Sequence, residues 1–347
     1  MAEPFRIGFT SDFFLPDGSS AFGDIGTGLL ESVPNVAWEQ IGERGPELQP
    51  EEIAPFDAIA VLSRRVPART LDGAPKLTIV ARYGVGYDSV DVPACTRNGV
   101  LLTITPEGVR RPMATVNLTY LLALSHRLLE QDRFIRAGGW ATKHEVRGVG
   151  LAGHTLGLVG FGNIAREFVT LARPLEMTVR AHDPFADPAA AAALGVELVD
   201  LDTLFETADF LAVLCALTPE TRHLVSAERL AQMKPTAYLI NAARGPIVDQ
   251  AALTQALQKG RLAGAALDVF EREPIDPGDP LLSLPNVLLS PHGLGLTDEW
   301  SYITGQVACA AMLDVAGGRV PPNVVNRDVL DSPILREKLR RYEEACR

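Results

Sequence analysis

The feature that most constrains this chain is a regular alternation of short apolar runs with segments of helical length. Apolar runs separated in this way are typical of βαβ units, so the alternation predicts parallel sheets. The predicted strands are Arg6–Thr10, Val36–Glu39, Ala58–Leu62, Leu77–Ala81, Val100–Ile104, Thr155–Gly160, Thr178–His182, Glu197–Val199, Phe210–Cys215, Ala237–Ile240, Gly264–Leu267 and Val287–Ser290.

The chain is long enough for two domains of this kind. At ~100–200 residues per domain, 347 residues predict two. The strands fall into two series separated by Pro106–Gly138, which is rich in leucine and alanine and predicts one long helix. We therefore expect two doubly wound, Rossmann-like α/β units. Further helices are predicted over Ala189–Ala193, from about Asp298 to Gly317, and over the charged tail Arg336–Arg347.

Charge and composition exclude several classes of partner. An apolar fraction of 47% supports a sizeable core, and a net charge of −11 argues against nucleic acid or an anionic membrane as a general partner. The start, MAEPFRIGFTSDF, lacks the pattern of a signal peptide, and no run of ~18 apolar residues predicts a membrane span. Scattered cysteines indicate free thiols in a reducing cytoplasm and no metal site; they are Cys95, Cys215, Cys309 and Cys346.

The stretch TLGLVGFGNIA, residues 155–165, has the pattern of a phosphate-binding turn between a strand and a helix. Gly160 permits the tight turn, and Gly162 lets a pyrophosphate approach the backbone. Ala165 takes the place of a third small residue, which allows the helix to pack closely on the strand. The helix N-terminus supplies free amides for the phosphates. A purely structural glycine turn is the alternative.

Asp183 favours the dinucleotide over that alternative. It ends the next predicted strand, where a carboxylate can accept hydrogen bonds from an adenosine ribose. No arginine or lysine lies between Asp183 and Leu194 to bind a 2′-phosphate. The sequence therefore predicts NAD rather than NADP as the cofactor.

Four polar residues follow predicted strands in the second half of the chain: Arg244, Asp268, Glu273 and His292. Carboxyl ends of parallel strands share one sheet edge, and open α/β sheets bind ligands there. A guanidinium suits a carboxylate ligand, and a histidine titrates near neutral pH. Taken singly, Arg244 is interpreted as a surface residue and His292 as a structural histidine. Together these residues indicate a reactive site.

The second half of the chain closely resembles the D-isomer-specific 2-hydroxyacid dehydrogenases, a family that includes D-lactate, glyoxylate/hydroxypyruvate and D-3-phosphoglycerate enzymes. The matching segments are TLGLVGFGNIA, ALTPETRHLVSAERLAQMKPTAYLINAARGPIVDQAAL, GAALDVFEREP and LSPH, over about residues 150–300. The first half matches more loosely, through ARYGVGYDSVDVPACTRNGV.

The resemblance implies a catalytic trio of Arg244, Glu273 and His292, with Asp268 beside the nicotinamide amide. It also implies substrate contacts from Gly84, Val85, Gly86 and Arg244. The cofactor contacts that it implies are Gly160, Gly162, Asn163, Ile164, Asp183, Cys215, Ala242, Arg244, Asp268, His292 and Gly295.

These residue types suit the interconversion of a D-2-hydroxy acid and its 2-oxo acid. Reduction needs a hydride on carbon and a proton on oxygen, and a protonated His292 is the natural proton donor. Glu273 in contact with the imidazole would fix its tautomer and favour the cation. Arg244 would hold the carboxylate and polarise the carbonyl. In the oxidative direction His292 is the base.

The resemblance also implies a discontinuous substrate-binding domain, residues 1–109 with 299–347, around an NAD-binding domain, residues 110–298. The active-site cleft is then expected between them. A homodimer is implied, through the cofactor domain and the arm Gln131–Gly150. Ser63-Arg64-Arg65 could meet a substrate's distal group, and Arg110-Arg111 could do the same or contact the cofactor phosphates. A solvated surface position is the alternative for both.

Some positions depart from the family pattern. Gly293-Leu294-Gly295 replaces the usual Ile-Gly-Gly after the histidine, and Ala165, Ala216 and Thr115 replace a glycine, a proline and an acid. None of these changes removes a catalytic group. A corepressor or scaffold that binds NAD(H) without turnover is the alternative function, because such proteins can keep the trio. A methyltransferase would leave Arg244, Glu273 and His292 unexplained.

Overall fold

The computed structural model describes residues 3–42 and 45–345. The chain forms two compact units, one of Met1–Val109 with Leu296–Arg347 and one of Arg110–Gly295. Cys346, for which a free thiol is expected, lies outside the described residues. So does Arg347, the last residue of the predicted helix Arg336–Arg347.

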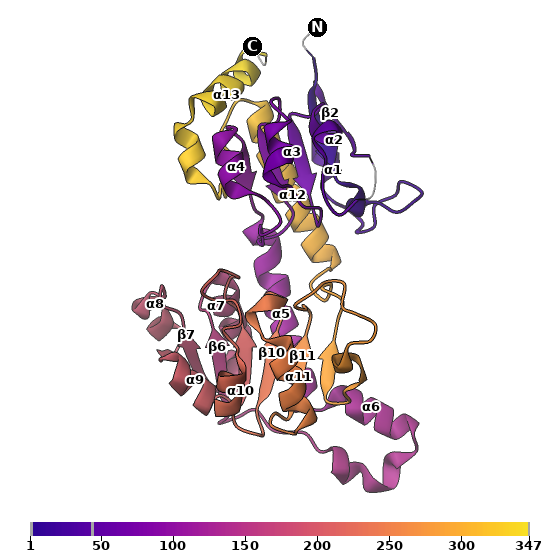
Figure 1. Ribbon diagram of the computed structural model, residues 1–347, viewed down its shortest axis with the longest axis vertical. Helices are drawn as coiled ribbons and strands as arrows, with labels where there is room; N and C mark the ends of the chain where they lie inside the picture. The colour runs from indigo at the N-terminus through magenta and orange to yellow at the C-terminus, as the bar shows by residue number, and fades with distance from the viewer. Residues whose placement is uncertain (1–2, 43–44, 346–347) are drawn as a thin grey trace. The chain divides into compact units, whose positions relative to one another are not determined.

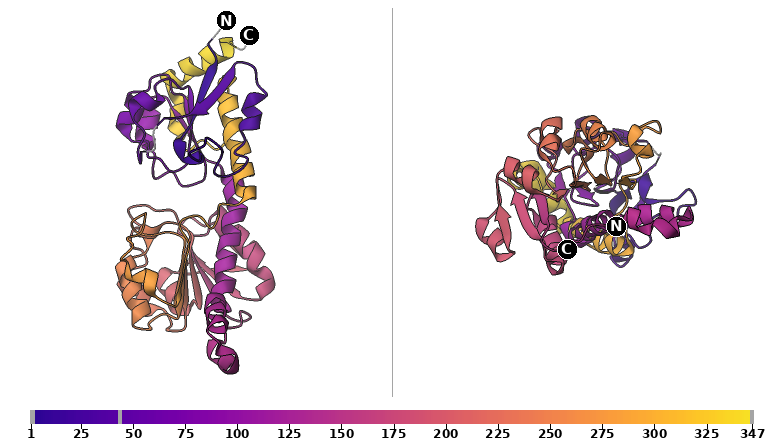
Figure 2. Two further views of the ribbon diagram at one scale, coloured as in Figure 1. Left: turned by 90° about the vertical axis from the view of Figure 1, so that its right-hand side faces the viewer. Right: turned by 90° about the horizontal axis from the view of Figure 1, so that it is seen from below.

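The first unit is built on a five-stranded parallel sheet in the order β2-β1-β3-β4-β5 (Figure 1). Its strands are β1 (Phe5–Phe9), β2 (Val36–Gln40), β3 (Ala58–Val61), β4 (Ile79–Arg82) and β5 (Leu101–Thr103). Figure 2 shows α1 (Thr27–Glu31) and α12 (Asp298–Ala316) on one face of this sheet, and α3 (Ala68–Asp72) and α4 (Val92–Arg97) on the other. The remaining helices are α2 (Pro50–Ile53) and α13 (Pro333–Ala345).

The second unit is built on a seven-stranded parallel sheet in the order β12-β11-β10-β9-β6-β7-β8. Its strands are β6 (Thr155–Val159), β7 (Thr178–His182), β8 (Val196–Leu198), β9 (Phe210–Val213), β10 (Tyr238–Asn241), β11 (Gly264–Leu267) and β12 (Val287–Leu289). The strand order reverses between β6 and β9, which is the arrangement of a dinucleotide-binding sheet.

Both faces of this sheet are buried, so the side chains of successive strand residues pack into two separate hydrophobic clusters, one on each face. Leu156 and Leu158 pack with α5 and α7, whereas Val159 packs with α9, α10 and α11. Because both faces are apolar, the strands read as continuous apolar runs in the sequence. The helices that pack on this sheet are α5 (Pro106–Ser125), α7 (Asn163–Ala172), α8 (Pro188–Ala193), α9 (Leu201–Thr207), α10 (Ala227–Gln232) and α11 (Gln250–Gln258).

The fold confirms the prediction of two doubly wound α/β units, and each predicted strand forms with its ends shifted by at most two residues. The single helix over Pro106–Gly138 is wrong. α5 ends at Ser125, Arg127 adopts a left-handed φ of 50°, and α6 (Leu128–Arg136) starts anew.

The break has a visible cause in hydrogen bonding. The Ser125 carbonyl accepts from the Val149 amide at 2.7 Å, and Arg127 donates to the Glu145 carbonyl at 3.0 Å. The Ser125 carbonyl and the Arg127 side chain thus bond to a segment that returns from farther along the chain. Hydrophobic periodicity depends only on neighbouring residues in the sequence, so it does not predict such long-range partners.

In the described part of the chain, no helix combines the length and the apolar character needed to cross a membrane.

The edge of the first sheet is covered by the segment around Asn326. The Asn326 side chain accepts from the Leu102 amide at 2.9 Å and donates to the Val100 carbonyl at 2.9 Å. Val325 donates its amide to the Leu102 carbonyl at 2.8 Å. The buried side chain of Asn326 thus satisfies backbone groups of an edge strand that would otherwise remain unpaired.

Asn326→Leu is expected to lower the free energy of unfolding of the first unit by about 2–4 kcal/mol, because it leaves buried backbone groups unsatisfied. Urea unfolding followed by the fluorescence of Trp38 and Trp300 measures this loss. Gln232→Leu, at an exposed amide, is the control and should change stability by less than about 0.5 kcal/mol. An Asn326→Leu variant as stable as the parent would contradict the role of the amide.

Candidate active site

The loops at the carboxyl ends of β6, β7, β9, β10, β11 and β12 share one edge of the seven-stranded sheet, since all these strands are parallel. Figure 1 shows these strands side by side in the second unit. The residues that the sequence singled out in these loops are Gly160, Gly162, Asp183, Cys215, Ala242, Arg244, Asp268, Glu273, His292 and Gly295.

The loop after β6 is tightly packed at Gly160 and open at Gly162. Gly160 has a φ of 98°, and a Cβ at this position would lie 2.7 Å from the Cys215 backbone nitrogen. At Gly162, the N-cap of α7, a Cβ would meet nothing within 4 Å, so the approach to the backbone is open. Asn163 and Ile164 begin the helix, where amides lack intrahelical acceptors. These residues fit the pyrophosphate of a dinucleotide.

Asp183 lies directly after β7 and holds the same loop. Its carboxylate accepts from the Phe161 amide at 2.8 Å and from the Phe185 amide at 2.9 Å. The sequence predicted an acid at this place but not its hydrogen bond to the glycine loop. A carboxylate has further lone pairs for a ribose hydroxyl.

The loops after β9 and β10 bring Cys215 and Ala242 to this edge. Burial raises the pKa of the Cys215 thiol to about 11, so the side chain is neutral at physiological pH. Ala242 is buried. Among the described residues, no cluster of three histidine, cysteine or acidic side chains could hold a metal ion.

Arg244 follows β10, and its loop packs tightly on the loop after β11. A Cβ at Gly245 would lie 1.8 Å from the Phe270 carbonyl oxygen, so only glycine permits this approach. The Asn241 side chain donates to the Arg244 carbonyl at 3.0 Å, which fixes the turn. Arg244 therefore lies next to the loop that carries Glu273.

His292 and Glu273 form a hydrogen-bonded pair, with 2.8 Å between the histidine Nδ1 and Oε2 of the carboxylate. The second carboxylate oxygen accepts from the Phe270 amide at 3.0 Å. Burial tends to raise the pKa of Glu273, but the hydrogen bonds from His292 and Phe270 and the charges of His292 and Arg244 hold it below 4.5. The carboxylate is thus ionised beside the imidazole. The two side chains are 46% and 37% exposed, so solvent reaches the pair.

The backbone around His292 is held by the buried carboxylate of Asp268. His292 adopts a left-handed φ of 51°, which few residues other than glycine do. One oxygen of Asp268 accepts from the amides of Gly293 at 3.0 Å and Leu294 at 3.2 Å. Within the described residues, its other oxygen accepts no hydrogen bond and is left for a ligand.

In the first unit, the Gly84-Val85-Gly86 turn follows β4. The Gly84 amide donates to the Thr105 hydroxyl at 2.8 Å, so it is already used within the protein. No acceptor in the described part of the chain takes the amides of Val85 and Gly86, which lie half-buried. Two of the three predicted amides therefore remain for a ligand.

All four arginines considered for a distal group or for cofactor phosphates have protein partners. Arg64 is buried against Glu52, at 2.9 Å, and against the Gly45 and Glu47 carbonyls. Arg65 pairs with Glu47 at 3.2 Å. In the second unit, Arg110 and Arg111 pair with Glu167, at 3.6 Å and 2.7 Å. Arg64 thus has a structural role.

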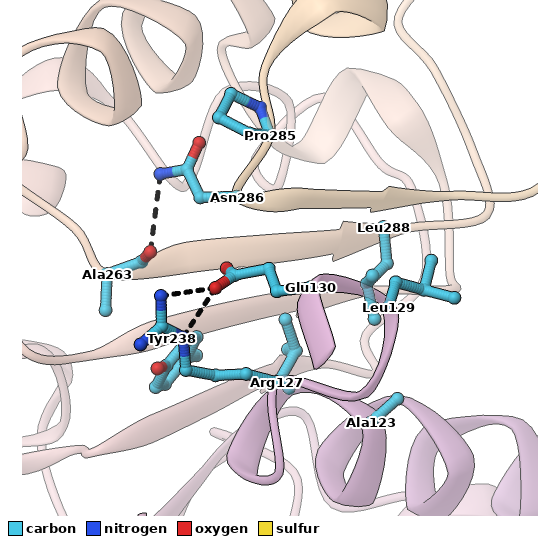
Figure 3. Close-up of a pocket in the computed structure, with 10 residues that line it drawn as sticks. Ala123, Arg127, Leu129, Glu130, Tyr238, Ala263, Pro285, Asn286 and Leu288 are labelled. Carbon is cyan, nitrogen blue, oxygen red and sulfur yellow. Dashed lines mark hydrogen bonds and ion pairs between the residues drawn. The ribbon is translucent and has the colours of Figure 1, made fainter. Parts of the chain in front are cut away.

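A pocket at the opposite edge of the seven-stranded sheet is separate from these residues. Figure 3 shows Tyr238, Ala263 and Asn286 at the amino ends of the strands, facing the α5–α6 corner with the Arg127–Glu130 ion pair. A wider hollow of about 800 Å³ continues from it toward Arg147. The residues of the carboxyl edge do not line it.

Sequence reasoning did not single out Ser290 and Tyr120. Ser290 donates its hydroxyl to Asp268, and Tyr120 on α5 contacts the Ser290 hydroxyl. The signal for Ser290 is its place at the end of a strand, two residues before His292. Tyr120 carries only a weak signal, one hydroxyl within an apolar helical run.

The geometry can be compared with known proteins. Residues 118–293 match the sequence model of the D-isomer-specific 2-hydroxyacid dehydrogenase NAD-binding domain, which confirms the prediction of an NAD-binding domain.

The chain is similar to curated and solved relatives along most of its length. It is 38% identical to the glyoxylate reductase of Thermococcus onnurineus over 310 residues, which cover 87% of this chain and 92% of the relative. It is 39% identical to the glyoxylate reductase of Thermococcus litoralis over 290 residues, 81% of this chain and 87% of the relative. The TT0316 protein of Thermus thermophilus has a TM-score of 0.81 at 32% identity, over 92% of this chain and 99% of that chain. The NAD-binding domain and these relatives together show that the chain belongs to the D-isomer-specific 2-hydroxyacid dehydrogenases, a family of NAD-dependent oxidoreductases.

Proposed function

We propose that this protein reduces small 2-oxo acids to D-2-hydroxy acids with NADH, and catalyses the reverse oxidation. Glyoxylate is the first substrate to consider, because the glyoxylate reductases of Thermococcus onnurineus and Thermococcus litoralis match most of the chain. The observation that carries the proposal is the His292–Glu273 pair beside the Arg244 loop, at the carboxyl edge of an NAD-binding domain.

His292 is assigned as the proton donor in reduction. NADH, when bound, supplies the hydride to the carbonyl carbon. The Glu273 carboxylate accepts a hydrogen bond from the imidazole Nδ1–H, and within the described residues Nε2 has no hydrogen-bond partner. A protonated Nε2 can therefore give its proton to the carbonyl oxygen of a substrate. In oxidation the same nitrogen takes the hydroxyl proton.

Glu273 is assigned to orient the imidazole and to favour its charged form. Its carboxyl stays ionised because its pKa lies below the ordinary value of 4.5. A carboxylate at 2.8 Å from Nδ1 fixes the tautomer and stabilises the imidazolium that donates the proton. Glu273 thus acts through His292 rather than on the substrate.

The substrate carboxylate is assigned to Arg244. Its planar guanidinium can donate two parallel hydrogen bonds, which fixes the orientation of the acid. From the first unit, residues 1–109 with the C-terminal segment, we assign the Gly84-Val85-Gly86 turn to the substrate, chiefly through the Val85 and Gly86 amides.

The cofactor is assigned to the loops after β6, β7, β9, β10, β11 and β12. Gly160, Gly162, Asn163 and Ile164 would hold the pyrophosphate, and Asp183 the adenosine ribose. Asp268 would accept a hydrogen bond from the nicotinamide amide. The remaining contacts are Cys215, Ala242, Arg244, His292 and Gly295.

We further propose a homodimer through the arm Gln131–Gly150. Large apolar side chains are exposed there and on the preceding turn of α6: Leu128, Leu129, Ile135, Trp140 and Val149. Trp140 is 71% exposed, and exposed large apolar side chains concentrated in one segment of the chain are candidates for an interface. The free thiols of Cys95, Cys215 and Cys309 fit a reducing compartment, and we propose the cytoplasm.

Replacing His292 tests the proton donor. His292→Ala is expected to lower kcat for glyoxylate reduction by ~10²–10⁴-fold, because the general acid is lost, while NADH still binds. Steady-state kinetics and NADH fluorescence measure the two effects. The control is His223→Ala, since His223 also pairs with a glutamate, Glu271, at 2.7 Å and also has a left-handed φ, 52°.

The control variant should keep the activity of the parent. If His292→Ala remains fully active, the assigned mechanism is wrong. If the parent itself turns over neither glyoxylate nor other 2-oxo acids, the corepressor or scaffold alternative gains support.

Replacing Glu273 tests its effect on the pH dependence of reduction. The pKa of Glu273 is lowered, so its carboxylate is present at and above pH 4.5 and is lost only as the pH falls through that lowered value. Glu273→Gln removes this charge, and with it the stabilisation that a neighbouring carboxylate gives to a protonated imidazole. The deficit in kcat/KM for reduction should therefore be larger at pH 8 than at pH 6. An equal deficit at both values would show that Glu273 has no electrostatic effect on the donor.

Replacing Asp183 tests the choice of cofactor. The parent is expected to prefer NADH to NADPH, because the Asp183 carboxylate binds a ribose diol and repels a 2′-phosphate. Asp183→Asn should reduce the ratio of kcat/KM for the two cofactors by ~10-fold, the size of a lost charged hydrogen bond. Asp187→Asn, at the cap of α8, is the matched control. A parent that already prefers NADPH would refute the assignment.

A further inference from the structure

The loop that carries His292 is anchored on a single buried carboxylate oxygen. Asp268 is 2% exposed. Its Oδ1 accepts three hydrogen bonds, from the Ser290 hydroxyl and from the amides of Gly293 and Leu294. The donors come from both sides of His292 in the sequence, so this oxygen holds the chain before and after the histidine.

The anchor extends to helix α5 through a second hydroxyl. The Tyr120 hydroxyl is hydrogen-bonded to the Ser290 hydroxyl. An ionised carboxylate can only accept, so the Ser290 proton points to Asp268 and the Ser290 oxygen accepts the Tyr120 proton. Burial raises the pKa of Tyr120 well above its ordinary value, and the charge of Asp268 also raises it, so the phenol keeps its proton.

Tyr120 is the fixed end of this series of hydrogen bonds, because its ring is buried in the core. It is 4% exposed and packs in the core between α5 and the seven-stranded sheet, with Leu121 and Leu124 of the same helix. The loop after β12 is more exposed, and His292 has a backbone conformation that must be held in place. A fixed hydroxyl on a packed helix supplies such a restraint.

We propose that Tyr120 and Ser290 are positioning residues, which act through Asp268 to hold the His292 imidazole in place for proton transfer. The proposal rests on the proposed function of His292. It extends the site to a helix whose sequence shows no catalytic motif. Proton transfer is sensitive to small displacements, because donor and acceptor must lie within hydrogen-bond distance in the reacting complex.

The test uses full-length Tyr120→Phe and Ser290→Ala, each of which breaks the series at one hydroxyl. Each should lower kcat for glyoxylate reduction by ~3–10-fold, the equivalent of one hydrogen bond, with little change in KM for NADH. Ser290→Thr keeps a hydroxyl and should restore kcat toward the parent value. Tyr238→Phe, the same change at the other edge of the sheet, should have no effect.

A second measurement needs no turnover. Hydrogen exchange followed by mass spectrometry reports the amides of Gly293 and Leu294, whose acceptor is Asp268. In Tyr120→Phe and Ser290→Ala these amides should exchange ~3–10-fold faster, while Ser290→Thr and Tyr238→Phe match the parent.

The outcomes separate the two proposals. Unchanged kcat and unchanged exchange in both variants would overturn the positioning role. A lower melting temperature with parental kcat would also overturn it, because the hydroxyls would then be merely structural. A parent without turnover whose Gly293–Leu294 exchange still responds would contradict the proposed function but support the anchoring of the loop by Tyr120 and Ser290.

Discussion

Parallel pairing in the second unit is the constraint on which the site depends. In a parallel sheet all carboxyl ends lie at one edge, so each strand delivers its following loop to the same place. The register strengthens this effect, since Leu267 of β11 pairs with both Asn241 of β10 and Leu289 of β12. The loops that begin after these residues carry Arg244, Asp268 and His292, which are far apart in the sequence.

Contacts between neighbouring loops then determine how the polar side chains at this edge lie relative to one another. The close approach of Gly245 to Phe270 places the arginine loop on the glutamate loop, and the Phe270 amide holds Glu273. Glu273 in turn holds His292. A carboxylate that stays ionised beside an imidazole favours the protonated imidazole, which is the form that the proposed proton donor requires.

Much of this could be predicted from the sequence, because its signals are local. Continuous apolar runs marked the strands, since both faces of each inner strand are buried. The glycine turn and Asp183 marked the cofactor loops through their spacing. The resemblance to a known family placed Arg244, Glu273 and His292, whose roles stay a proposal.

Other features could not be predicted, because they depend on partners distant in the sequence. The break at Arg127 follows from hydrogen bonds to Glu145 and Val149, which no helical periodicity records. The Gly84 amide is taken by Thr105.

The sequence by itself determined the class of fold, the position of the glycine turn after β6 and the residue types at the strand ends, because periodicity and spacing are properties of neighbouring residues. Only the tertiary structure decided that Glu273 faces Nδ1 of His292, and that Tyr120 supports the same loop through Ser290 and Asp268. Such contacts arise when packing brings a helix and several strand ends together. The physical reason is that hydrogen bonds depend on distance in space, and the order of residues along the chain does not contain that distance.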